Sequence, residues 1–169
     1  MKIGFVVNHA TQFEVPFYQY VALHYPEHLF KVFYIKENRS GHYDEELGKN
    51  IKWGFDLYSN YPFIFLGARP FHTFEEELKI ETYDLIILNG YKEQYSGYIA
   101  ICKQKRIPVA LKLDNVIFNQ TVWKIYLRKI LLRNKYAAFD FFFVTGRVSV
   151  DYLLEMNISP QRIGIFSYC

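Results

Sequence analysis

The feature that most restricts the fold of this chain is a series of short apolar runs, each followed by a segment with helical periodicity. The runs span residues 2–7, 31–35, 63–66, 84–88, 108–113, 141–145 and 162–167. They are continuous rather than alternating, which indicates strands that are buried on both faces, as in a parallel sheet covered by helices. The chain is therefore expected to contain a parallel sheet with helices on its two sides.

Helices are expected between these strands, at residues 13–25, 73–80, 94–105, 121–136 and 148–156. Pro16 suits the first turn of the first helix, where a missing N–H group costs little. Thr73 followed by Glu76 fits a capping box at the start of the second helix, and residues 36–60 are expected to be polar and irregular. Strands and helices in alternation predict an α/β fold with a doubly wound, mostly parallel, Rossmann-like sheet.

Length and charge narrow the class of protein. A chain of 169 residues is long enough for one domain with a substantial core, and its 22% of charged residues is typical of a globular protein. The formal net charge of +3 is too small to indicate a nucleic-acid partner. The high aromatic fraction, 20%, has two explanations that the sequence leaves open: codon usage in an AT-rich genome, or a surface whose rings stack on sugars.

The cysteines and apolar segments bear on the cellular compartment. Cys102 and Cys169 have no metal-binding spacing and suggest no disulfide framework, which suits a reducing cytoplasm. The apolar run at the N-terminus is too short for a signal peptide, and no segment approaches the length of a membrane span. We therefore expect a cytoplasmic protein, with no metal site.

The loop after the first strand is the first candidate for binding chemistry, because ligands of such sheets bind beyond the carboxyl ends of the strands. It lacks the glycine-rich dinucleotide motif and instead carries Asn8, His9, Thr11 and Gln12. These side chains offer several directional hydrogen bonds to a polyhydroxylated ligand, beside a helix N-terminus that favours an anionic group. The alternative is that they only satisfy the backbone and cap the helix.

Three further loops follow expected strands and carry Asn89-Gly90, Asp114-Asn115 and Gly146-Arg147. Gly90 permits close approach of a ligand, or belongs to an ordinary turn. Asp114 is placed to accept a proton from an acceptor hydroxyl, or only caps the next helix. Arg147 offers a guanidinium to a phosphate, or is solvated.

The helical segment 122–135 has an unusual distribution of charge. It contains five cations and no acid: Lys124, Arg128, Lys129, Arg133 and Lys135. At helical spacing one broad apolar face results: Val122, Trp123, Tyr126, Leu127, Ile130 and Leu131. Such a helix suits the surface of an anionic membrane. The alternative is a helix packed in the core, whose long cationic side chains extend over its edges.

Four stretches of the chain, in order and spacing, resemble family 4 glycosyltransferases, particularly the bacterial polysaccharide-type branch. They are KIGFVVNHATQFEVPFYQYVA, with its His-x-x-Gln step, YDEELGKNIKWGFDLYSNYPFIFL with Trp53, IPVALKLDN, and AAFDFFFVTGRVSVDYLLEMNISPQRIGIFSYC. The resemblance implies the N-terminal half of a GT-B fold. Residues 1–169 would form one acceptor-side domain, truncated before a C-terminal domain that binds the donor.

The resemblance also implies a function, the transfer of a sugar from a nucleotide diphosphate sugar to a glycan or lipid-linked acceptor. The chemistry would need no metal or separate cofactor, and retention of configuration is favoured. His9 is then the first candidate for a catalytic group, with Asp114 second. The expected acceptor-binding residues are Asn8, Gln12, Asn89, Gly90, Asn115, Gly146 and Arg147. An enzyme with a lipid-linked acceptor would lie at the inner membrane surface.

Two positions depart from the family pattern. Many members carry a histidine near the position of Asn89. An asparagine cannot take up a proton, so a catalytic base would have to be His9 or Asp114. Relatives often have Arg-Gly-Asp-Ser where this chain has Lys112-Leu113-Asp114-Asn115. These departures leave open which residue acts at the reaction centre.

Two other functions fit the same fold. One is a non-catalytic binding module that pairs with a separate donor domain. The other is a nucleotide-sugar epimerase of similar two-domain shape, whose first half usually opens with a Gly-Thr-Arg-Pro-type loop. This chain has no such loop, since its first strand is followed by Asn8-His9-Ala10-Thr11.

Overall fold

The computed structural model of the protein describes residues 1–37, 42–44, 48–51, 56–90, 94–113 and 122–166. The chain divides into two compact units, one formed by Met1–Tyr83 and the other beginning at Asp84. Each unit has its own parallel strands and its own helices, and each is described in turn.

The first unit is built on three parallel strands in the order β5-β2-β1. Its elements are β1 (Lys2–Val7), α1 (Val15–His24), β2 (Leu29–Tyr34), β5 (Phe63–Phe65) and α2 (Pro70–Ile80). The register pairs Val7 with Tyr34 and Tyr34 with Phe65, so the carboxyl ends of the three strands lie at one edge.

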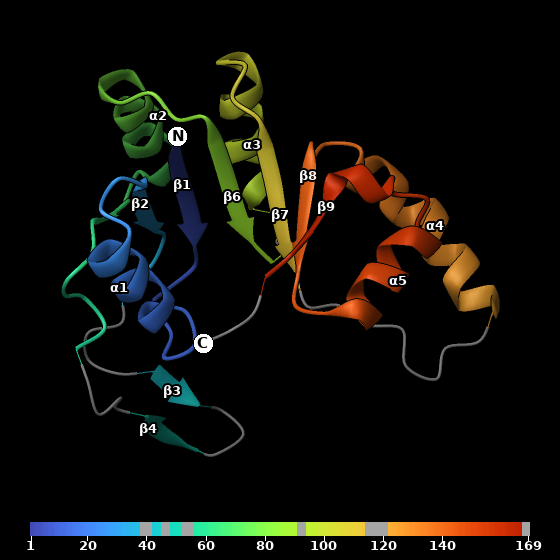
Figure 1. The fold of residues 1–169 in the computed structure, drawn as a ribbon, viewed down its shortest axis with the longest axis horizontal. Helices are drawn as coiled ribbons and strands as arrows, with labels where there is room; N and C mark the ends of the chain where they lie inside the picture. Colours follow the sequence, from blue (N-terminus) through green and yellow to red (C-terminus); the bar gives the residue numbers. More distant parts are fainter. Residues whose placement is uncertain (38–41, 45–47, 52–55, 91–93, 114–121, 167–169) are drawn as a thin grey trace. The chain divides into compact units, whose positions relative to one another are not determined.

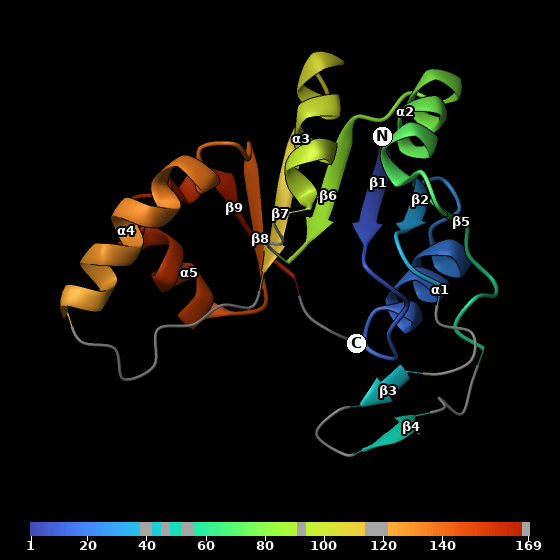
Figure 2. The ribbon, with the colours of Figure 1, turned by 180° about the vertical axis from the view of Figure 1, so that it is seen from behind.

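Helices α1 and α2 cover opposite faces of these strands. Tyr18 of α1 packs on Phe5 and Phe30, with ring centroids 5.2 and 6.1 Å away, whereas Phe33 meets Phe74 of α2 at 5.1 Å. Successive residues of a strand point to opposite faces, so Phe30 and Phe33 of β2 face different helices. Figure 1 shows α1 in front of the strands, and Figure 2 shows the other face with α2.

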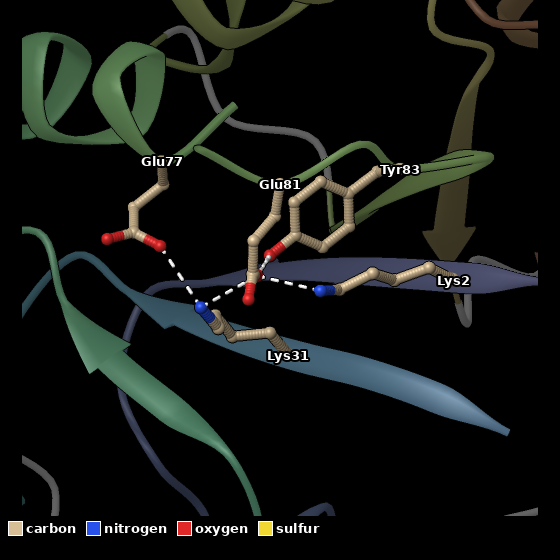
Figure 3. A network of polar contacts seen from close by, with 5 residues as sticks. All are labelled: Lys2, Lys31, Glu77, Glu81 and Tyr83. Carbon is tan, nitrogen blue, oxygen red and sulfur yellow. Dashed lines mark hydrogen bonds and ion pairs between the residues drawn. The ribbon is translucent and has the colours of Figure 1, made fainter. Parts of the chain in front are cut away.

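An ion-pair network ties α2 and the residues after it to the amino-terminal halves of β1 and β2 (Figure 3). The Glu81 carboxylate lies 2.8 Å from the Nζ atoms of both Lys2 and Lys31, and it accepts a hydrogen bond from the Tyr83 hydroxyl at 2.7 Å. Lys31 also contacts Glu77 of α2 at 3.1 Å. The bonds from Lys2, Lys31 and Tyr83 lower the pKa of Glu81 to about 2.

Two short strands, β3 (His42–Asp44) and β4 (Lys49–Ile51), form an antiparallel pair. The prediction of an irregular segment at residues 36–60 is wrong for these positions. Gly48, which precedes β4, has a φ of +60°, a conformation that glycine adopts without steric cost. The sequences of these two strands show no alternation of apolar and polar residues. Their pairing rests on backbone hydrogen bonds, which leave no such pattern in the sequence.

The second unit has four parallel strands in the order β6-β7-β8-β9. Its elements are β6 (Leu85–Asn89), α3 (Tyr95–Gln104), β7 (Val109–Leu113), α4 (Val122–Tyr136), β8 (Phe141–Val144), α5 (Arg147–Glu155), a 3-10 turn (Pro160–Arg162) and β9 (Ile163–Ile165). All five residues of β7 are buried, as expected for a strand covered on both faces. Tyr136 of α4 and Tyr152 of α5 meet through their hydroxyl groups at 3.1 Å.

The expected fold class, an α/β Rossmann-like arrangement of parallel strands and helices, is confirmed. Several boundaries differ from the prediction, and two of them have a clear physical cause. Helix α2 begins at Pro70 rather than Thr73, because a proline is suited to the first helical position; the Thr73 hydroxyl donates to the carbonyl of Arg69 instead of capping. The last strand is shorter than residues 162–167, since Pro160–Arg162 form a 3-10 turn.

Candidate functional site

The loop after β1 leaves the sheet at its carboxyl edge with Asn8 and His9, both half-buried. The loop is anchored to the end of β2, because the backbone N–H of Lys36 donates to the carbonyl of Asn8 at 2.7 Å. The side-chain Nδ2 of Asn8 lies 3.0 Å from Nδ1 of His9. The two side chains that the sequence placed first in the site are therefore in direct contact.

This contact determines which tautomer of the neutral His9 imidazole fits beside the Asn8 amide. Nδ2 of an asparagine only donates, so Nδ1 of His9 accepts, and in the neutral ring the proton lies on Nε2. In this arrangement His9 is a hydrogen-bond donor through Nε2. A base role through Nε2 requires the other tautomer, in which the Asn8 side-chain oxygen accepts from Nδ1–H.

The start of α1 brings a residue that the sequence reasoning missed. Glu14 occupies the N-cap position without a capping hydrogen bond from its side chain, and that side chain is buried, with 4% of the residue exposed. The carbonyl of Thr11 accepts from the N–H groups of Glu14 and Val15. Gln12 is half-buried in the same loop. The sequence did carry a signal for Glu14: it is an acidic residue directly before Val15, the first residue of the helix.

Asn89 and Gly90 lie at the carboxyl end of β6, in the second unit. The carbonyl of Asn89 accepts from the Tyr95 hydroxyl at 3.0 Å, and the N–H of Gly90 donates to the carbonyl of Lys112 at 2.7 Å. Gly90 has a φ of +72°, which favours glycine, and, its chain neighbours aside, no heavy atom of the described residues lies within 4 Å of where a Cβ would be. Gly90 thus serves the turn and leaves open space beside it.

The parallel register places other predicted residues at the same edge of the second unit. Asn89 pairs with Lys112, and Leu113 with Val144, so the ends of β6, β7 and β8 lie side by side. Gly146 and Arg147 follow β8; Gly146 is the N-cap of α5, and Arg147 is exposed. Asp114 and Asn115, which follow β7, lie outside the described residues.

Lys112 is a second residue that the sequence reasoning did not assign to the site. It is the penultimate residue of β7 and only 9% exposed, and its Nζ lies 4.4 Å from the centroid of the Phe166 ring. Such a cation–π contact holds the ammonium group over the face of the ring. A lysine within the otherwise apolar run PVALKL was the signal.

Helix α4 exposes apolar side chains. Trp123, Ile130 and Leu131 are 63%, 55% and 61% exposed, whereas Tyr136 in the last turn is buried. Packing of this face in the core of the chain, one of the two alternatives from the sequence, therefore does not apply to these three residues. The side chains of Val122 and of residues 124–129, which include three of the five cations, lie outside the described part.

The described residues contain no group of three or more His, Cys, Asp or Glu side chains that would hold a metal ion. Among them there is also no helix with the length and apolar character needed to cross a bilayer. Cys102 is buried in α3, and burial raises the pKa of its thiol to about 12.

Comparison with known proteins finds likeness in structure but not in sequence. No protein-family model matches the chain. No curated protein sequence matches it either. Among solved structures, UDP-N-acetylglucosamine 2-epimerases from Rickettsia bellii and Methanocaldococcus jannaschii are similar over 99% and 98% of this chain, with TM-scores of 0.58 and 0.57. Sequence identities are 16% and 14%.

A third similar structure is the UDP-GlcNAc 2-epimerase from Neisseria meningitidis bound to UDP-GlcNAc, with a TM-score of 0.54 and 17% identity. The chain covers 45% of the length of each of these three proteins. At this identity the similarity establishes the fold: the chain resembles half of a GT-B-like protein. The expected GT-B-like architecture is supported, and the assignment to family 4 glycosyltransferases is not established by these matches.

Proposed function

We propose that this chain is the acceptor-side half of a GT-B-like sugar-nucleotide enzyme, and that the enzyme transfers a sugar from a nucleotide diphosphate sugar to a glycan or lipid-linked acceptor. The observation that carries the proposal is the Asn8–His9 pair at the carboxyl edge of β1, where ligands of such sheets bind. The pair lies in a GT-B-like fold, and the loop that holds it is polar rather than glycine-rich.

The polar groups of each unit have separate roles in this proposal. Nε2–H of His9 donates to an oxygen of the acceptor, and Asn8 holds the imidazole in that orientation. Asp114 is the proposed base, because a carboxylate accepts the proton of the attacking hydroxyl more readily than the Nε2–H tautomer of His9. The remaining predicted residues, Gln12, Asn89, Gly90, Asn115, Gly146 and Arg147, are proposed to contact the acceptor.

The donor is proposed to bind mainly to a second domain, which supplies the charge that stabilises the leaving diphosphate. The 169-residue chain by itself should then bind nucleotide sugars weakly. Isothermal titration calorimetry with UDP- and GDP-linked sugars tests this expectation. A dissociation constant below about 10 µM, equivalent to roughly −7 kcal/mol, would place the donor site in this chain and overturn the division of roles.

A second function, epimerisation of a nucleotide sugar, is favoured by one observation: the similar solved structures are UDP-GlcNAc 2-epimerases. Against it, the loop after β1 lacks the Gly-Thr-Arg-Pro-type sequence. Incubation of the complete enzyme with a panel of nucleotide sugars distinguishes the two. A transferase consumes the donor only when an acceptor is added and releases a nucleoside diphosphate, whereas an epimerase isomerises the sugar without an acceptor.

A further inference from the structure

An open hollow of about 590 Å³ lies beside helix α1 in the first unit. It is lined by Gln19, Tyr20, Ala22, Leu23, His24 and Asn60. The volume is within the range of small-molecule sites, about 300–1,000 Å³. None of the lining residues belongs to the loop after β1, and the proposed function makes no use of them.

An exposed group of rings borders this hollow. The Tyr20 and His24 rings have centroids 4.3 Å apart, and Tyr25 lies 6.1 Å from Tyr20. Tyr20 is 51% exposed and Tyr25 43% exposed. Contact with a second ring limits the orientations that the Tyr20 ring adopts, so its exposed surface is arranged before any ligand arrives. Grouped exposed aromatic side chains of this kind are typical of binding surfaces.

Two amide side chains lie at the same hollow. Nε2 of Gln19 donates to the backbone carbonyls of Asp56, at 3.4 Å, and Ser59, at 3.1 Å. These bonds occupy both N–H groups and fix the amide, so its carbonyl oxygen remains as an acceptor. Asn60 is exposed and has a φ of +64°, and its amide contributes donors as well as an acceptor.

The lining also limits the charge of the ligand. Among the described residues the lining contains no Lys, Arg, Asp or Glu, so a phosphate or a carboxylate would meet no opposite charge from a described lysine or arginine of the lining. A lipid chain is disfavoured because the Gln19 and Asn60 amides interrupt the apolar surface. A neutral sugar satisfies both conditions, since one face of a pyranose ring presents C–H groups to an aromatic ring while its hydroxyls take hydrogen bonds.

We propose that this hollow binds a neutral glycan, with a sugar ring stacked on Tyr20 and its hydroxyls bonded to the amides of Gln19 and Asn60. The site goes beyond the proposed function, because none of its lining residues is among those assigned to acceptor chemistry. Binding here is measured without a nucleotide sugar, so the two proposals succeed or fail independently.

Titration of the ¹⁵N-labelled chain with cellotetraose, chitotetraose and maltotetraose, followed by amide chemical shifts, tests the proposal. We expect at least one of these sugars to shift the resonances of α1 and of Asn60 at millimolar concentration. Tyr20→Ala should weaken that binding by about tenfold or more, whereas Tyr20→Phe, which keeps the ring, should stay within about threefold. Phe71→Ala removes another exposed ring, on α2, and is the matched control.

Several results would overturn the proposal. These are the absence of shifts in α1 with all three sugars, equal binding by wild type and Tyr20→Ala, or a similar loss in Phe71→Ala. Stronger binding of a heparin tetrasaccharide, or of monomeric dihexanoylphosphatidylcholine, would assign the hollow to an anionic or lipid ligand instead. Because Tyr20 is exposed, its substitution leaves the core intact, and an unchanged melting temperature verifies this for each variant.

Discussion

The side-chain amide of Asn8 donates to Nδ1 of His9 over 3.0 Å, so the histidine presents a proton rather than a lone pair on Nε2. His9→Ala in the complete enzyme should therefore lower turnover on the order of 100-fold, because a positioned hydrogen-bonding group is lost at the reaction centre. Stability should change little, since His9 is only half-buried. Steady-state kinetics with a melting curve of the same sample separates the two effects.

Asn8→Asp tests the direction of this hydrogen bond. An aspartate accepts from Nδ1–H and turns Nε2 into an acceptor, so turnover should fall by about tenfold if the enzyme needs the donor. Asn8→Ala is the control, because it removes the hydrogen bond to Nδ1 of His9 without reversing its direction. Its turnover should lie between those of wild type and Asn8→Asp. Higher activity in Asn8→Asp than in wild type would instead assign His9 the role of base.

Lys112 is expected to hold an anionic group of the substrate from its position at the carboxyl edge of β7. Lys112→Met keeps the length of the buried side chain but removes the charge, so KM should rise by about tenfold with little loss of stability. Lys112→Arg should restore most of the affinity. If Lys112→Met unfolds the protein while its KM at lower temperature is normal, the role of Lys112 is structural.

Helix α4 is expected to bind anionic membranes through its exposed Trp123, Ile130 and Leu131 together with its cations. Each cation near an anionic surface contributes about 1 kcal/mol to the binding free energy. Salt weakens this attraction, because the Debye length is only about 8 Å at physiological ionic strength. The chain should float with phosphatidylserine liposomes at low salt but not with phosphatidylcholine liposomes. A variant with Glu at positions 124, 128 and 129 should not float; equal flotation of both proteins would exclude an electrostatic role for α4.

The Glu81 network predicts how stability depends on pH. The folded pKa of Glu81, about 2, is below the usual value of 4.5. The carboxylate therefore contributes its full stabilisation above about pH 4.5 and loses it as the pH falls towards 2. With allowance for solvent screening, we expect Glu81→Gln to cost about 1–2 kcal/mol at pH 7, and the difference in urea midpoint to disappear near pH 2.

Glu75→Gln on α2 is the control for this measurement, because that side chain is not part of the ion-pair network around Lys2 and Lys31. It should leave the urea midpoint at pH 7 unchanged. A constant difference between wild type and Glu81→Gln from pH 7 to pH 2 would mean that packing, rather than the charge of Glu81, is responsible.

Cys102 should resist alkylation in the native protein. Its thiol is fully buried in α3, and burial raises its pKa to about 12, so both access and the thiolate fraction are low. Mass-spectrometric peptide mapping after treatment with iodoacetamide at pH 8 distinguishes Cys102 from Cys169. Labelling of Cys102 should require urea, and equal rates in native and urea-treated protein would contradict its burial.

The sequence alone was enough to predict the order of the parallel strands along the chain and the fold class. Its apolar runs are continuous, and only strands covered on both faces require this pattern, as β7 illustrates with five buried residues. The same logic placed Asn8, His9, Asn89 and Gly146 at the carboxyl ends of strands, where the structure has them. It did not predict β3 and β4, whose pairing depends on backbone groups.

Only the tertiary structure decided which side chains meet. Periodicity reports local burial, whereas a contact such as Lys2 with Glu81 or Lys112 with Phe166 joins residues that are far apart in the chain. Local sequence suggested that Thr73 caps α2, but the helix starts at Pro70. The tautomer of His9 likewise depends on a single 3.0 Å contact, in a loop whose backbone bonds to Lys36 just after β2.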